Sequence, residues 1–363
     1  MHPPRIAAAA ILNETGQTLQ WAALLGLSAL LAGLFMALGL PAALLMGPML
    51  AGIAITASGG RIGLSEPLFA LAQGLVGCMI GGMLSTMMAA APTGDGHWGV
   101  AIGGALLVIV ISTILSWFLN RLGVLPGTTA LWGLSPGAAT VMAVMSEGYG
   151  ANSQIVALMQ YLRLVLVVVI ASTTARILGA NTHHALADAY WLAPVRWGPF
   201  AATMALAVAG ALIALRLRIP AGGLLLPLFA GAGLIEMGWL QVELPPLLLA
   251  LGYAAIGWRI GLRFTPATLL LAAKALPQIL ACTLALILSC AGLAALLVVE
   301  AGIDPLTAFV ATSPGGADTA AIIAASSHKI DAGFVMTMQT VRFVAVLFAA
   351  PALARALSRR APR

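Results

Sequence analysis

Two arginines lie inside apolar runs of the chain, each three residues after a glutamine. Gln160 and Arg163 belong to the segment MQYLR, and Gln339 and Arg342 belong to the segment MQTVR, 179 positions later. Residues three apart share one face of a helix, so each segment presents an amide beside a guanidinium. Charged groups within membranes are costly and often functional. Because guanidiniums bind oxyanions through paired hydrogen bonds, the pattern predicts a site for a small anion.

A helix-breaking motif precedes each pair. The first copy reads Ser135-Pro136-Gly137 followed by Ala138, and the second reads Ser313-Pro314-Gly315-Gly316. Proline removes a backbone hydrogen bond, and glycine adds conformational freedom, so each motif predicts a broken helix. Serine suits the N-cap and proline the first helical turn. We therefore expect half-helices that begin near Pro136 and Pro314 to point free N–H groups, with partial positive charge, at each break.

These two clusters together form the predicted substrate site. Its members are Ser135, Pro136, Gly137, Gln160, Arg163, Ser313, Pro314, Gly315, Gly316, Gln339 and Arg342. A structural alternative stays open, in which each arginine neutralises Glu147 or Asp318, or caps the carbonyls of a broken helix. Asp318 has Thr140 as its counterpart in the first copy. A buried carboxylate can carry a coupling proton, but Asp318 can also simply pair with Arg342 or stabilise the start of its half-helix.

Composition places the whole chain in a membrane. Of its residues 61% are hydrophobic and 8% are charged, against about 25% charged in a typical soluble domain. The longest polar stretch, 179–198, is too short for a separate DNA-binding module, so we expect no nucleic-acid partner. Cys78, Cys282 and Cys290 lie in apolar runs, and we interpret them as small core residues.

The repeated motifs belong to a longer duplication. The segment 41–52 matches 220–231 at a shift of 179, and Gly77 and Gly81 match Gly257 and Gly261 at a shift of 180. A nearly constant shift indicates an internal repeat. We predict an N-terminal cytoplasmic segment, a first membrane repeat, an external linker, a second membrane repeat and a basic C-terminal tail. Their respective bounds are 1–18, 19–178, 179–198, 199–357 and 358–363.

Each copy contains six hydrophobic elements, and the fifth holds the Ser-Pro-Gly motif. The elements run near 19–38, 41–57, 66–90, 98–121, 128–147 and 152–178, and near 199–215, 220–237, 245–263, 271–298, 306–327 and 333–357. If the fifth element is re-entrant, twelve Lys and Arg side chains fall inside and three outside; if it spans, the count is nine against six. The positive-inside rule favours the re-entrant case. The prediction is an all-α integral membrane protein with two inverted repeats, each of five transmembrane helices plus one re-entrant, broken helix.

The paired Ser-Pro-Gly and MQxxR segments, with the duplication, resemble the bacterial AbrB-type membrane protein family. The resemblance covers nearly the whole chain, and an older label for the family is ammonia monooxygenase. It implies an inner-membrane protein that is linked by name to regulation of gene expression. It supplies no substrate and no catalytic residues.

These observations predict a secondary transporter that moves a small anion by alternating access. We expect a bacterial inner-membrane location, cytoplasmic termini, lipid contact, and no cofactor, metal or enzymatic activity. Glycine-rich faces such as Gly77, Gly81 and Gly82 also allow a homodimer. The alternative is a membrane sensor that binds the ligand and signals through a partner. A copper enzyme would need clustered imidazoles, and only His183 and His184, in the linker, are adjacent.

Overall fold

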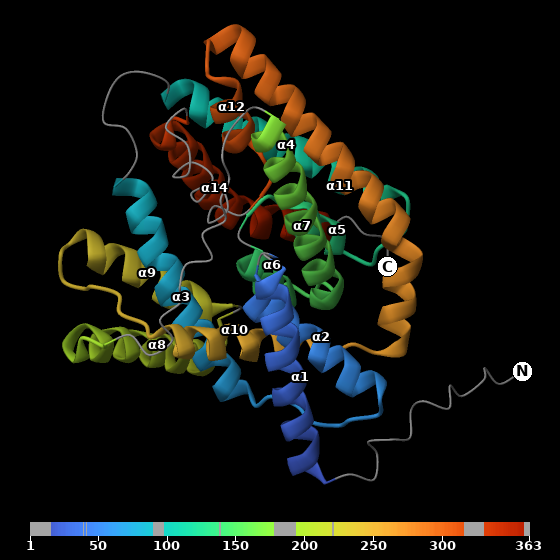
Figure 1. Ribbon diagram of the computed structural model, residues 1–363, viewed down its shortest axis with the longest axis vertical. Helices are drawn as coiled ribbons and strands as arrows, with labels where there is room; N and C mark the ends of the chain where they lie inside the picture. Colours follow the sequence, from blue (N-terminus) through green and yellow to red (C-terminus); the bar gives the residue numbers. More distant parts are fainter. Residues whose placement is uncertain are drawn as a thin grey trace, which may run out of the picture. The chain divides into compact units, whose positions relative to one another are not determined.

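The computed structural model describes residues 16–38, 40, 42–89, 98–137, 139–177, 194–219, 221–315 and 330–358. Within these ranges the regular structure is entirely helical (Figure 1). The helices of the first half are α1 (Gln17–Ala37), α2 (Ala43–Ala57), α3 (Glu66–Ala89), α4 (Trp98–Arg121), α5 (Thr129–Leu134), α6 (Ala139–Gly148) and α7 (Ser153–Ile177). Those of the second half are α8 (Trp197–Leu217), α9 (Gly222–Glu236), α10 (Pro246–Gly261), α11 (Pro266–Ala301), α12 (Pro305–Thr312) and α14 (Ala332–Ser358).

Six of the described helices are long and apolar enough to cross a bilayer. These are α1, α3, α4, α8, α11 and α14, and four shorter apolar segments accompany them. The all-α membrane class is therefore confirmed, whereas the inverted arrangement of the repeats stays a prediction. Helix α11 has 36 residues, more than the expected range 271–298. Its start is set by Pro266 in the first turn and by the hydroxyl of Thr265, which accepts a hydrogen bond from the Thr268 N–H at 3.1 Å.

The described helices form two compact units, and each unit combines parts of both halves of the chain. One unit holds α1, α2, most of α3, and α8 to α10. The other holds α4 to α7, most of α11, α12 and α14. The compact units thus do not coincide with the two sequence copies, 19–178 and 199–357. Both Ser-Pro-Gly motifs belong to the second unit.

In the first unit, glycines let helices from different halves cross at backbone contact. A Cβ on Gly77 of α3 would overlap the carbonyl oxygen of Leu224 in α9. A Cβ on Gly257 of α10 would lie 2.5 Å from the carbonyl oxygen of Leu45 in α2. Gly257 is the repeat counterpart of Gly77, and Leu224 that of Leu45. The two halves therefore exchange equivalent contacts.

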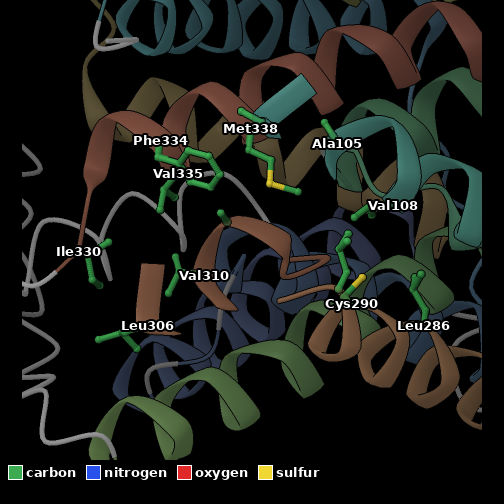
Figure 2. Close-up of a cluster of buried hydrophobic side chains, with 13 residues drawn as sticks. Ala105, Val108, Leu286, Cys290, Leu306, Val310, Ile330, Phe334, Val335 and Met338 are labelled. Atoms are coloured by element: carbon green, nitrogen blue, oxygen red, sulfur yellow. The ribbon is translucent and has the colours of Figure 1, made fainter. Parts of the chain in front are cut away.

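The second unit has an apolar core between α4, α11, α12 and α14 (Figure 2). Val108 of α4, Leu286 of α11 and Val335 of α14 are fully buried within it. Met338 lies against α4, where its Cε would be 2.8 Å from a Cβ on Gly104. This core fixes the position of α14, which carries Gln339 and Arg342.

Candidate functional site

The first Ser-Pro-Gly motif separates two short helices. Helix α5 ends at Leu134, Ser135 is its C-terminal cap, and α6 begins at Ala139. The residue before a proline is driven to an extended conformation, and Ser135 has ψ 124°. The Ser135 hydroxyl donates to the Leu131 carbonyl at 2.6 Å. The expected N-cap role of this serine is therefore wrong, because its hydroxyl is a donor to the preceding helix.

Arg163 and Gln160 of α7 donate hydrogen bonds to carbonyl groups at the C-terminal end of α5. The Arg163 Nη1 donates to the carbonyls of Ser135 at 2.9 Å and Leu134 at 3.3 Å. The Gln160 amide donates to the carbonyls of Trp132 at 2.7 Å and Ser135 at 3.0 Å. Arg163 Nη2 donates to Gln160 Oε1 at 2.7 Å, which fixes both side chains. Both are buried, Arg163 with 2% of its surface exposed.

The second copy reproduces this arrangement. Helix α12 ends at Thr312, and Ser313 is its C-terminal cap with ψ 133°. Arg342 Nη1 donates to the carbonyls of Ser313 at 2.8 Å and Thr312 at 3.5 Å, and Nη2 donates to that of Gly315 at 3.4 Å. Arg342 also donates to Gln339 Oε1, and the Gln339 amide donates to the Val310 carbonyl at 3.3 Å. The Ser313 hydroxyl again donates backward, to the Val310 carbonyl; the residues that follow Gly315, where the second half-helix is expected, lie outside the described residues.

These contacts show that the arginines cap the carbonyls of the broken helices, one of the structural alternatives considered above. Both guanidiniums cap the C-terminal carbonyls of a broken helix, which lack helical partners. In the part of the chain that the structure describes, neither guanidinium forms an ion pair with a carboxylate. Glu147, near the end of α6, is thus not the partner of Arg163. The suggested partner Asp318, together with Gly316, lies outside the described residues.

The start of the last helix in each copy is tied to the broken segment by one more pair of matched contacts. Asn152 accepts from the Ile155 N–H at 3.1 Å, and its own N–H donates to the Thr129 hydroxyl at 3.2 Å. In the same way, the Asp331 side chain accepts from the Phe334 N–H at 3.0 Å, and the Asp331 backbone N–H donates to the Thr307 hydroxyl at 3.0 Å.

Each break also faces the last helix of the other copy. A Cβ on Gly137 would lie 3.4 Å from Val346 Cγ1 of α14, and one on Gly315 would lie 3.0 Å from Val167 Cγ1 of α7. Val167 and Val346 occupy equivalent repeat positions, 179 residues apart. The two broken segments are thus brought together with both arginine-bearing helices within one unit.

A small cavity lies beside the second break. Its volume is about 10 Å³, and it is lined by Val167, Ile170, Ile287, Cys290, Ala291, Phe309, Thr312, Ser313 and Pro314. Such a volume holds about one water molecule. Neither Val167 nor Cys290 is among the site residues that the sequence pattern predicts. The repeat relation between Val167 and Val346 was the signal that could have found the valine.

Two buried donors in the first copy have no acceptor within the described residues. They are the Nε of Arg163 and the indole Nε1 of Trp132. Trp132 is fully buried in α5 and packs on Tyr149 with ring centroids 5.4 Å apart. An unpaired buried donor costs about 1–3 kcal/mol, so both atoms are candidates for a contact with a bound polar group.

The chain was compared with known families and proteins. The model of the family described as "Transition state regulatory protein AbrB" matches residues 44–358. A protein of Escherichia coli (strain K12) named "Putative regulator AbrB" is 42% identical over 351 residues, which cover 95% of this chain and 98% of that protein. "Uncharacterized protein YhjN" of Bacillus subtilis (strain 168) is 25% identical over 378 residues, with coverages of 96% and 89%. No solved structure matches the chain.

Proposed function

We propose, on the premise that this chain belongs to the AbrB family, that it is a secondary transporter for a small anion in the bacterial inner membrane. The observation that carries the proposal is the pair of broken helices, one from each half, held in one unit by buried arginines. Irregular backbone inside a bilayer is tolerated where it is buried in protein or lines a cavity. Broken helices of this kind form the substrate sites of many transporters.

Inverted repeats and alternating access complete the proposal. The reciprocal contacts of Gly77 with Leu224 and of Gly257 with Leu45 support a twofold relation between the halves. Five crossings and a re-entrant element in each half invert the second half relative to the first, and the charge bias of the sequence supports cytoplasmic termini. The solute site lies at the two breaks, where Arg163 and Arg342 supply positive charge.

The charge balance supports an anion rather than a cation. Two guanidiniums with 2% exposure each face carbonyl and amide oxygens, which satisfy hydrogen bonds but carry no full negative charge. A charge in a low-dielectric interior is costly unless it is compensated. An anion at the breaks would offset part of the double positive charge. Asp318 is the candidate that couples transport to a proton.

A direct flux measurement tests the proposal. Purified protein is reconstituted into liposomes, and charge movement and solute uptake are recorded after rapid exchange among formate, acetate, nitrate, phosphate and chloride. Saturable uptake above that of protein-free liposomes supports transport. Uptake that is absent for every small anion tested, with protein that is folded and inserted, contradicts it.

A second candidate is a membrane sensor that affects gene expression through a partner. The observation that favours it is the printed name of the Escherichia coli relative, which calls that protein a regulator. A sensor binds the anion without moving it. Anion binding without flux, together with a partner whose association depends on the anion, would favour this candidate. A metalloenzyme would instead contain copper or iron in stoichiometric amounts.

A further inference from the structure

The two buried arginines differ in how many of their N–H groups are used. A guanidinium has five N–H donors. Arg342 uses four of them: two from Nη1, to Thr312 and Ser313, and two from Nη2, to Gly315 and Gln339. Arg163 uses three: two from Nη1, and one from Nη2 to Gln160. Within the described residues, Arg163 Nε has no acceptor, and its Nη2, which carries two hydrogens, has the single acceptor Gln160 Oε1.

The Nε hydrogen of Arg163 lies on the same edge of the planar group as one of the two Nη2 hydrogens, and Gln160 is the single described acceptor of Nη2. Such an edge binds the two oxygens of a carboxylate in parallel hydrogen bonds. In Arg342 both hydrogens of Nη2 already have acceptors, so the corresponding edge is not available. We propose that the Nε–Nη2 edge of Arg163 binds a planar oxyanion such as a carboxylate or nitrate, and that Arg342 only holds the second break together. This proposal rests on the proposed function and assigns the solute class of the same site.

One lining residue of the small cavity, Val167, follows Arg163 on the same helix. Val167 lies one helical turn beyond Arg163, on the same face of α7. It lines the cavity with Cys290 and with Thr312, Ser313 and Pro314. At about 10 Å³ this cavity has room for about one water molecule, so an anion would need it to widen. Val167 also approaches the position of a Gly315 Cβ to 3.0 Å, so it is the side chain that limits the size of the solute.

Cys290 makes the site measurable without transport. The test uses protein in which Cys78 and Cys282 are replaced by alanine, so that Cys290 is the one remaining thiol. A small uncharged methanethiosulfonate, which can reach the buried Cys290 thiol only when its surroundings open, is applied in the presence of formate, acetate, nitrate or chloride. We expect the planar oxyanions to slow modification and chloride to have a much smaller effect.

Matched variants then assign the contact. Arg163→Lys keeps the charge and removes the edge, and we expect it to weaken protection by oxyanions about tenfold or more. Arg342→Lys is the control, because it makes an equivalent change where no edge is free, and protection should stay within about threefold. Val167→Ala should extend protection to larger carboxylates such as benzoate. That variant keeps the proposal testable if either lysine variant does not fold.

Three results would overturn the assignment: equal loss of protection in both lysine variants, equal protection by chloride, or no protection by any oxyanion. The proposed function is judged separately by flux. Transport in the wild type, with both lysine variants equally impaired, would support transport and refute the role of the Arg163 edge. Protection that depends on Arg163, without flux, would support the oxyanion site and refute transport.

Discussion

Gly257→Ala should destabilise the protein although alanine is the better helix former. In α10 the new Cβ would lie 2.5 Å from the Leu45 carbonyl oxygen and 3.0 Å from the Met49 nitrogen. Favourable carbon contacts begin near about 3.5 Å, so α2 and α10 would have to separate by about 1 Å. Both contacting atoms are backbone atoms, and they cannot move away by changing a rotamer.

The expected size of the effect follows from two opposing terms. Overpacking costs about 1–3 kcal/mol, and replacing glycine by alanine within a helix returns about 0.5–1 kcal/mol. The net loss for Gly257→Ala is therefore between about 0 and 2.5 kcal/mol. Gly233→Ala in α9 is the matched control, because no atom lies within 4 Å of its Cβ position. This control should be stabilised by about 0.5–1 kcal/mol.

Reversible unfolding in mixed micelles with increasing dodecyl sulfate, followed by tryptophan fluorescence, gives the free energy of unfolding for both variants. Gly77→Ala should behave like Gly257→Ala, since its Cβ would overlap the Leu224 carbonyl oxygen of α9. Equal stability of Gly257→Ala and Gly233→Ala would refute the close crossing of α2 and α10. Loss in one of the two repeat glycines alone would refute the equivalence of the two crossings.

Three further substitutions test the polar contacts of the second unit. Arg163→Gln leaves the Ser135 carbonyl with one donor fewer and should lower the free energy of unfolding by about 2–4 kcal/mol, as measured in the same micelles. Wild-type stability of this variant would show that Arg163 does not cap the end of α5. Thr129→Val and Thr307→Val each remove the acceptor of one backbone N–H and should cost about 1–2 kcal/mol with nearly equal values, whereas a large difference would contradict their equivalence. Asp304→Ala removes the side chain that accepts from two N–H groups at the start of α12 and should cost about 1 kcal/mol; Asp304→Asn, which keeps a cap acceptor, should cost less.

The sequence was sufficient to predict the helices and the breaks. Apolar runs bounded by glycine, proline and charge gave ranges that agree with the observed helices within a few residues, apart from α11 and from the element 306–327, of which residues 316–327 lie outside the described residues. Breaks were predicted at Pro136 and Pro314, and the helices α5 and α12 do end just before them. These features are local, because chain chemistry within a few residues determines them.

The partners of the polar groups could not be obtained in the same way. Serine before proline is compatible with the end of one helix and with the start of the next. The Ser135 hydroxyl donates to the Leu131 carbonyl, and α6 begins only at Ala139, which decides for the former. Arg163 reaches carbonyls 28 and 29 residues away, and hydrophobic periodicity contains no information about such distances. The division into units that mix both halves is likewise a long-range property.

The exchange of crossing helices between the halves has a consequence for synthesis. One contact surface of α3 is on α9, and α2 has one on α10 besides the one on α1, so these two surfaces of the first half leave the ribosome without their partners. At about 5–20 residues per second, a repeat of 179 residues takes roughly 10–40 s to follow. During that interval the surface of α3 that faces α9 and the surface of α2 that faces α10 can be covered only by lipid or by the insertion machinery. If translation stalls within the second half, the truncated membrane protein therefore keeps two helix surfaces without their packing partners. We expect membrane proteases to degrade such a product.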